Sequence, residues 1–393
     1  MNIDTRIKRR QHDADGLVHD DEAISPVAHV ADPVGRGPTF ETLLDYLGPV
    51  FDGDLPPNAY VWGPAGAGKS AVVTGLFAHL QPHRSQLGTV VHTATRARPG
   101  RERPQPFVYV DARAATTDFG IYHAILDGVV EESVPTQGVR TDALLSQLLD
   151  ALAPPARRVV VAVDHVGESR SYSLSELAET LAPVDDRLAW LAIGRDHPTD
   201  LESEPPARRI AVPAYDTQSL VDVVTSRAMS GLGDRAITHR RSRELAAWAD
   251  GSAHDALAAL FAAADRARVG ERSRLTDDDI AHARDEIPRA CVPLAQVLML
   301  SPNRQRVLHA LLDVEADRCS SVDSTAAAIA ETPDVALSPG TVKRYLYEFA
   351  DEGIVERVRT DGSTSGRPPS RVEPRFPTRV FRRLYERGSS GDA

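Results

Sequence analysis

The chain has 393 residues, 42% of them hydrophobic, which is enough for two or three globular domains. No apolar stretch approaches the roughly 20 residues that span a bilayer, and the charged residues 1–10 lack the apolar segment of a secretory signal. We therefore expect a cytoplasmic protein without a membrane partner. Cys291 and Cys319 are too few for a disulfide framework and lack metal-type spacing, so we expect no role for them.

The net charge of −11, taken alone, argues against a nucleic-acid partner. Only three of the 45 basic residues are lysines (Lys8, Lys69 and Lys343), and this bias with the acidic surplus is typical of proteins adapted to high salt. Acidity then serves solubility, so the local charge distribution decides what the chain binds. Between Arg357 and Arg387, nine arginines oppose three acids, a local excess of six positive charges.

The first half of the chain predicts an arm followed by an α/β domain. Residues 1–35 are polar, lack periodicity and indicate a flexible N-terminal arm with a basic cluster at 6–10. From residue 36 to 213, short apolar segments alternate with helical stretches. Strands that are apolar on both faces, with helices between them, predict a parallel sheet covered on both sides. The expected strands are 58–62, 107–110, 158–163, 188–193 and 210–212.

A phosphate-binding motif follows the first expected strand, and a helix is expected directly after it, over 70–79. The residues that match the pattern GxxxxGK[ST] are Gly63, Pro64, Ala65, Gly66, Ala67, Gly68, Lys69 and Ser70. A strand, a turn and a helix N-terminus direct backbone N–H groups at one point, which suits a triphosphate. We expect ATP and Mg²⁺ as cofactors, with Lys69 on the β- and γ-phosphates, Ser70 on the metal and Ala71 beside them. The alternative is a glycine-rich turn without a ligand.

Beyond residue 213 the strands stop. Residues 214–290 are rich in alanine and leucine and predict a helical lid, with helices over 244–248 and 256–266. Residues 291–393 predict three helices and then a hairpin that carries arginines. This layout is typical of a winged helix, whose third helix can enter the major groove of DNA. The three expected helices are 303–313, 324–330 and 338–352.

We expect the winged helix to bind double-stranded DNA. A winged helix can instead dock a protein, but the basic hairpin favours DNA. The candidate contacts lie on the exposed side of the third helix and on the hairpin. They are Thr341, Lys343, Arg344, Tyr347, Arg367 and Arg371.

The order and spacing of several segments resemble one family. The segments are 33–36 (a leading arginine), 39–47 (a first helix), 107–113 (a second strand), 137–149 (a helix), 213–216 (the start of the lid) and 251–257 (a second sensor). With the phosphate loop and the winged helix, they resemble the archaeal replication initiators related to the origin recognition complex and the cell-division-control ATPases. The resemblance covers nearly the whole chain. It implies an α/β fold: an AAA+ P-loop parallel-sheet domain with a helical lid, followed by a C-terminal winged-helix domain.

The resemblance also assigns residues to the nucleotide and its metal. Asp164, after the third strand, would hold Mg²⁺ together with Ser70, while Tyr215 and His254 would contact the nucleotide. His254 stands where the second sensor of the family has an arginine that stabilises transition-state charge. Arg195 stands where the first sensor has a polar amide.

The catalytic glutamate of the family is replaced in this chain. It follows the metal-binding aspartate in the family, whereas His165 follows Asp164 here, and the charged form of a histidine cannot act as a base. Glu168 is the candidate substitute if its loop folds back, so Asp164 and Glu168 are the candidate catalytic residues. With three positions altered beside an intact phosphate loop, we expect ATP binding with slow or absent hydrolysis.

Three smaller features leave alternatives open. Arg208 and Arg209 either act as an arginine finger on a neighbouring subunit or are solvated surface residues. The loop 167–173, with Arg170 as its cation, lies where the family carries a DNA-contacting insertion. The histidines His165 and His254 lack the spacing of a zinc site.

These features favour an ATP-binding AAA+ DNA-binding protein resembling the archaeal initiators, in which the nucleotide is a conformational ligand more than a fuel. The alternative is an ATP-sensing transcriptional regulator with the same modules. Footprinted origin-type repeats favour the first hypothesis, and promoters favour the second. A metabolic kinase or hydrolase would leave the C-terminal module without a task. The first hypothesis also allows a replicative helicase or a second copy of the chain as a partner. It places the protein in the cytoplasm, associated with the nucleoid.

Overall fold

The structure is a computed structural model that describes residues 16–80, 107–130, 132–154, 158–288, 291–359 and 370–391. The described residues form two compact units. One is His29–Ser219, and the other combines the described residues up to Ala28 with those from Leu220 onward. Among the described helices, none has both the length and the apolarity that crossing a bilayer requires.

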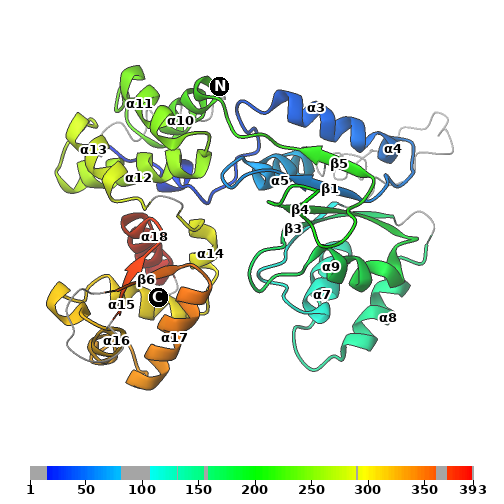
Figure 1. The fold of residues 1–393 in the computed structure, drawn as a ribbon. Coiled ribbons are helices and arrows are strands. Elements are labelled where there is room, and N and C mark those ends of the chain that lie inside the picture. The colour runs from blue at the N-terminus through cyan, green and yellow to red at the C-terminus, as the bar shows by residue number, and fades with distance from the viewer. Residues whose placement is uncertain are drawn as a thin grey trace. The chain divides into compact units, whose positions relative to one another are not determined.

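The unit His29–Ser219 contains a five-stranded parallel sheet in the order β2-β3-β4-β1-β5 (Figure 1). This confirms the predicted parallel sheet. The β3 and β4 strands are apolar on both faces because helices cover both. The strands are β1 (Ala59–Trp62), β2 (Phe107–Asp111), β3 (Val159–Val166), β4 (Leu188–Gly194) and β5 (Arg208–Ala211).

The two faces of this sheet belong to two separate hydrophobic clusters. Alternate residues of β3 divide between them, with Val161 in one and Val160 in the other, as the period of two in a strand requires. The first cluster is covered by α7 (Asp118–Val129), α8 (Thr141–Ala151) and α9 (Leu174–Leu181), and the second by α3 (Gly37–Tyr46), α4 (Gly48–Phe51) and α5 (Lys69–Leu80). The phosphate loop therefore joins a central strand to a helix packed on one face.

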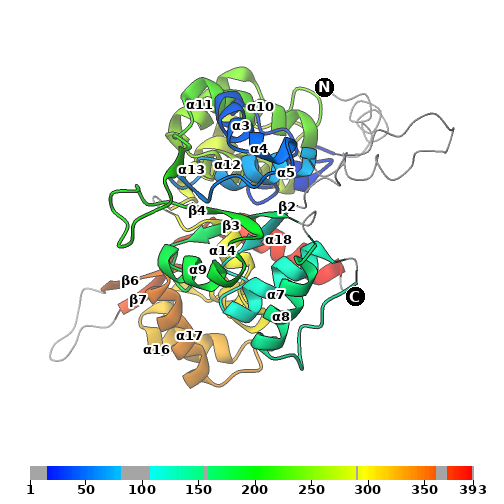
Figure 2. The same cartoon turned by 90° about the vertical axis from the view of Figure 1, so that its right-hand side faces the viewer.

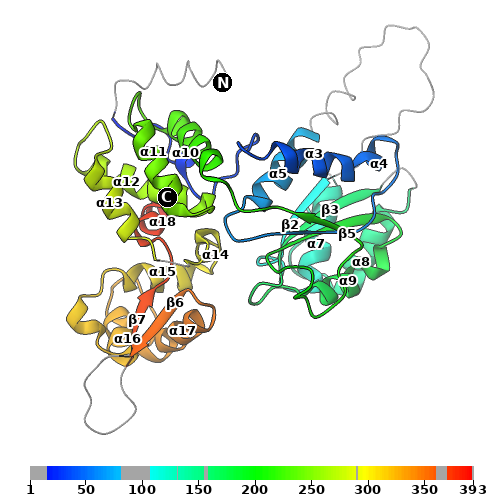
Figure 3. The ribbon, with the colours of Figure 1, turned by 45° about the horizontal axis from the view of Figure 1, so that its top comes forward.

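The second unit begins with a helical group that corresponds to the expected lid (Figure 3). Its helices are α10 (Thr217–Gly231), α11 (His239–Ala249), α12 (Ala253–Val269) and α13 (Asp277–Asp285). Residues 17–28 also belong here and include the short α2 (Asp21–Ile24), which differs from the flexible arm expected over 1–35. Leu17 and Ile24 are buried, and the buried guanidinium of Arg227 donates to the carbonyls of Ser25 and Ala28. Four helical residues are too few to produce a periodic pattern in the sequence.

The remaining residues of this unit form the expected winged helix. Helices α15 (Pro302–Leu311), α16 (Val322–Ala330) and α17 (Pro339–Asp351) precede an antiparallel pair, β6 (Val355–Arg359) and β7 (Ser370–Pro374), visible in Figure 2. The helix α14 (Leu294–Leu298), the turn η2 (Ala316–Cys319) and α18 (Thr378–Gly391) complete the module. Ser338 caps α17 through its side chain, and Gly353 follows the helix with a φ of 72°.

Candidate nucleotide-binding site

Charged residues follow four of the five parallel strands of the first unit, at the carboxyl ends that share one edge of the sheet. The phosphate loop follows β1, Arg113 follows β2, and Arg195 follows β4. Asp164 and His165 lie near the end of β3, and Glu168 follows that strand. Ion pairs join the groups from β2, β3 and β4. The ends of strands in open parallel sheets are where ligands of this fold class bind, so this edge is the candidate site.

The phosphate loop uses glycine where the chain has no room for a side chain. Gly63 has a φ of 153°, and a Cβ there would collide with the carbonyl oxygen of Val212. Gly68 has a φ of 76°, and its Cβ would lie 2.9 Å from the hydroxyl of Tyr215. Both positions therefore require glycine. The Tyr215 ring, predicted to contact the nucleotide, lies directly against the loop.

The Lys69 side chain is held inside the loop. Its Nζ donates to the carbonyls of Gly63 at 2.7 Å and Pro64 at 2.9 Å, and the residue is only 9% exposed. Burial lowers the pKa of the ammonium to about 8, although the carboxylate of Asp164 opposes this shift. The charges of Arg195, Glu168 and Arg36 also act on Lys69, so these groups surround one point.

The lowered pKa of Lys69 predicts a specific dependence of stability on pH. Between the folded pKa of about 8 and the ordinary value of 10.5, the unfolded chain binds more protons, so stability rises with pH. The shift corresponds to about 3 kcal/mol in the free energy of unfolding. We expect Lys69→Met to be the more stable protein at pH 7 and to lose this advantage by pH 10.5, measured by urea unfolding. Parallel pH curves for the two proteins would contradict the burial of the charge.

Asp164 is positioned by two donors. The side chain is 2% exposed; its Oδ2 accepts from the Tyr109 hydroxyl at 2.6 Å and its Oδ1 from the backbone N–H of His165 at 2.7 Å. Burial raises the pKa of Tyr109, and the Asp164 charge raises it further, so this tyrosine stays a donor. His165 has a φ of 65° at a shift in the β3–β4 register, a bulge that turns the strand end.

The loop after β3 folds back and brings Glu168 into the site. Its Oε1 lies 2.7 Å from Arg195 Nη2 and 3.1 Å from His165 Nδ1. Burial opposes ionisation, but the hydrogen bond and charge of His165, with the charges of Arg195 and Arg113, lower the pKa of the carboxyl overall. Glu168 could replace the catalytic carboxylate only if its loop folds back, and the loop does so. However, a carboxylate that is held by cations is a weak base.

Arg36 and Tyr215 form a stacked pair beside the loop. The guanidinium lies 3.5 Å from the centroid of the Tyr215 ring, and the arginine is 4% exposed. Its Nε and Nη2 are buried without a hydrogen-bond partner among the described residues. A buried arginine with two unused donors, close enough to act on the Lys69 charge, offers further contacts to an anionic ligand.

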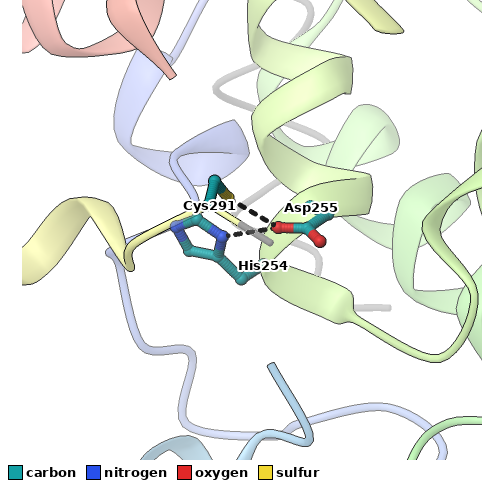
Figure 4. A group of neighbouring side chains, drawn as sticks. All are labelled: His254, Asp255 and Cys291. Carbon is teal, nitrogen blue, oxygen red and sulfur yellow. Dashed lines mark hydrogen bonds and ion pairs between the residues drawn. The ribbon is translucent and has the colours of Figure 1, made fainter. Parts of the chain in front are cut away.

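His254 lies in the other unit, at the start of α12, where it joins the helix to the segment before α14 (Figure 4). Its Nδ1 is 3.0 Å from Asp255 Oδ1, and its Nε2 accepts the backbone N–H of Leu294 at 3.0 Å. Nε2 is therefore unprotonated, and Nδ1 is the protonated nitrogen that donates to Asp255. The sensor role of His254 stays a prediction.

Cys291 completes this group, because its Sγ also donates to Asp255 Oδ1, at 3.2 Å. The donor atoms of His254, Asp255 and Cys291 lie within 4.8 Å of one another, which invites a metal interpretation. A metal on Nδ1 would have to displace the proton that Nδ1 donates, while Nε2 still accepts the Leu294 N–H. Burial also raises the pKa of the Cys291 thiol, and the Asp255 charge raises it further. The group is better explained as a hydrogen-bonded joint between α12 and α14 than as a metal site.

The DNA-contact candidates that the structure describes lie on two elements of the winged helix. Thr341, Lys343, Arg344 and Tyr347 lie on α17, away from its buried residues, and Arg371 lies on β7. Arg367 lies outside the described residues. Three candidates are paired with acids: Lys343 Nζ with Asp323 at 2.6 Å, Arg371 Nε with Glu373 at 2.7 Å, and Arg344 Nε with Glu348 at 3.9 Å.

Several residues of the site had weak signals in the sequence. Arg36 and the segment Tyr109 to Arg113 were noted only as matches to the family. The ring contact of Arg36 with Tyr215 joins residues far apart in the chain, which no local pattern could reveal. Arg195 was noted for the amide it replaces, whereas the structure shows its ion pair with Glu168.

Comparison with known proteins gives consistent results. Residues 32–191 match the AAA ATPase domain family. An ORC1-type DNA replication protein of Methanoregula boonei is 24% identical over 307 residues, 71% of this chain and 67% of the relative. ORC1-type DNA replication protein 10 of Halobacterium salinarum is 24% identical over 365 residues, 84% and 83% of the two chains. The ORC1 protein of Aeropyrum pernix, solved in complex with DNA, aligns with a TM-score of 0.62 and 20% identity over 96% of this chain and 98% of that one.

Proposed function

The chain is a member of the archaeal family of AAA+ ATPases that includes the ORC1-type DNA replication proteins, and from this membership we propose that it is an ATP-binding replication initiator that binds duplex DNA. The observation that carries the proposal is a phosphate loop with a buried lysine in the same chain as a winged helix. The first binds phosphate, and the second presents a helix and a hairpin to DNA.

The nucleotide we propose is ATP with Mg²⁺. The donors present fit a triphosphate: Lys69 in the loop and the unused guanidinium nitrogens of Arg36. Ser70 and Asp164 would hold the metal, which when bound neutralises charge on the phosphates. Tyr109 and the His165 N–H hold the Asp164 carboxylate in one orientation. Tyr215, stacked on Arg36, lies where it can contact the rest of the nucleotide.

Hydrolysis is expected to be slow in this proposal. Glu168 is the carboxylate nearest to the position of the missing catalytic group, but Arg195 and His165 occupy its Oε1. ATP then acts chiefly by favouring one conformation, through its different affinities for the two states. Arg208 and Arg209 are exposed on β5 and stay candidates for contact with a second copy of the chain. A replicative helicase as partner and association with the nucleoid belong to the same proposal.

A titration of labelled duplex DNA, with and without ATP and Mg²⁺, tests the proposal. We expect binding in both states, with affinities that differ by about 5-fold or more, the lower range of allosteric coupling. The buffer should include high salt because the acidic composition indicates that environment. Absence of DNA binding in both states would contradict the proposal. Binding confined to promoter fragments would favour the transcriptional alternative.

The same titration locates the interface. Replacing Arg367 and Arg371 together by glutamine should weaken DNA binding and reduce the slope of log affinity against log salt by about 1 for each DNA phosphate that these arginines neutralise. Glu373→Gln is the matched control, because it releases Arg371 from its ion pair and should tighten binding. Unchanged affinity and slope in the double variant would remove the hairpin from the interface.

A further inference from the structure

The two faces of the β6–β7 hairpin carry different side chains. Residues opposite each other in an antiparallel pair share a face, and Arg357 pairs with Val372. Because side chains alternate along a strand, Val355 and Arg359 lie on that face as well. The two valines are buried, whereas the two arginines are exposed. This face, which we call the inner face, therefore continues from the core of the winged helix outward to two cations.

The opposite, outer face of the hairpin carries balanced charges. It includes Glu356, Arg371 and Glu373. Arg371 pairs with Glu373, and Glu356 Oε2 lies 3.0 Å from Nη1 of Arg375, which follows β7. A phosphate that approaches the described part of this face therefore meets a carboxylate beside each guanidinium, and the carboxylates repel it.

The cations of the inner face differ from the other DNA-contact candidates in their partners. On α17, Lys343 and Arg344 are each paired with an acid, as Arg371 is on the outer face. Arg357 and Arg359 form no ion pair among the residues that the structure describes. A cation that must first leave its acid gains less from neutralising a phosphate than one without an acid, because the lost ion pair offsets part of the gain.

Arg357 is also held in place by an aromatic ring. Strand β6 lies beside α17 (Figure 2), and the guanidinium carbon of Arg357 is 4.7 Å from the centroid of the Tyr347 ring. This distance is within the roughly 6 Å over which the face of a ring attracts a cation. Nη2 of the arginine lies 3.4 Å from the Ser370 hydroxyl oxygen on β7. The side chain is therefore exposed and yet positioned, which reduces the conformational entropy that it loses when it binds.

We propose that Arg357 binds a phosphate of the DNA backbone and that Tyr347 positions it, an inference that rests on the DNA binding proposed above. The N–H groups of Arg357 donate to the phosphate oxygens, since the fork of a guanidinium matches two such oxygens at once. Tyr347, expected from the sequence to contact DNA itself, then acts through the arginine that lies over its ring. Arg359 adds a second positive charge to the inner face.

Titrations of the full chain with labelled duplex DNA, over a range of salt concentrations, test the arginine contact. Arg357→Gln should weaken binding and reduce the slope of log affinity against log salt by about 1, the change expected for one phosphate. Arg306→Gln is the matched control and should leave the slope unchanged. Arg306 is an exposed arginine on α15 of the same module, where it is hydrogen-bonded to Asn303.

A double-mutant comparison separates positioning by Tyr347 from direct contact. Tyr347→Leu should weaken DNA binding by about 2- to 5-fold, the range for an exposed pair of a cation and a ring. The same change should have no further effect in the Arg357→Gln variant, because the interaction that it removes is already absent there. Tyr347→Phe keeps the ring face and should restore most of the affinity that Tyr347→Leu loses.

The outcomes distinguish this inference from the proposed function. If the natural chain binds DNA and Arg357→Gln matches Arg306→Gln in affinity and salt slope, Arg357 does not contact a phosphate and the inference is wrong. Additive losses from Tyr347→Leu and Arg357→Gln would contradict the positioning role, since a ring that binds DNA directly or only supports the fold lowers affinity equally in both backgrounds. If the natural chain does not bind duplex DNA with or without ATP, the proposed function fails, and this inference fails with it.

Discussion

Replacing Lys69 with alanine is expected to lower the affinity for ATP by about 100-fold or more while the fold stays intact. The ammonium already lies within the loop, where it donates to the carbonyls of Gly63 and Pro64. Two charge-assisted hydrogen bonds to phosphate are worth about 3 kcal/mol or more together, which is about 100-fold in affinity. Calorimetry with ATP and Mg²⁺ measures the effect directly.

The variant should fold at least as well as the natural chain. Burial disfavours the charged form of Lys69, as its lowered pKa shows, so removing the ammonium relieves an unfavourable term in the folded protein. Arg158→Gln is a suitable control, because Arg158 pairs with Asp54 on the same unit but does not belong to the ion pairs at the site. Equal affinity for ATP in the Lys69→Ala variant and the natural chain would exclude the phosphate-loop assignment.

The sheet and the phosphate loop were predictable because each is encoded by contiguous residues. Runs such as Val159 to Val163 are apolar at every position and rich in β-branched valine, which is typical of a strand buried on both faces. The loop from Gly63 to Ser70 is likewise local, because its glycines and its lysine act through the backbone next to them. Boundaries were less certain: β3 extends to Val166, beyond the predicted end at residue 163.

The arrangement of the charged groups was not predictable in the same way. Glu168 reaches Arg195 because Gly167, with a φ of 83°, turns the chain and its N–H bonds the Tyr172 carbonyl at 2.7 Å. The sequence contains all these residues, but only the folded loop decides whether Glu168 faces the site or solvent.

The proposed function combines nucleotide binding with slow turnover, and the contacts at the site give a physical reason for that combination. We expect nucleotide binding to depend on backbone amides, Lys69 and Arg36, and none of these needs to act as a base. Turnover requires a free carboxylate beside the phosphate, and the carboxylate available, Glu168, is neutralised by Arg195 and His165. Such a protein changes state when ATP binds and returns when ATP dissociates, which suits a conformational ligand.

His165→Glu is expected to raise the rate of ATP hydrolysis by about 100-fold, the lower range of general-base catalysis. The substitution removes the hydrogen bond to Glu168 and places a new carboxylate among Asp111, Asp164 and Glu168. Repulsion from these three acids should raise the pKa of the new carboxyl, so that it accepts a proton more readily and acts as a better base. Single-turnover hydrolysis at saturating ATP separates this effect from any change in affinity.

His165→Gln is the control that isolates the new carboxylate. Glutamine has nearly the same shape as glutamate and also removes the imidazole, but it cannot accept a proton, so the rate should stay at the level of the natural chain. Equal acceleration in both variants would mean that the imidazole inhibits hydrolysis and that Glu168, once released from it, is the base. Brisk hydrolysis by the natural chain would contradict the slow turnover inferred from the Glu168 contacts, because the held carboxylate would then be an adequate base.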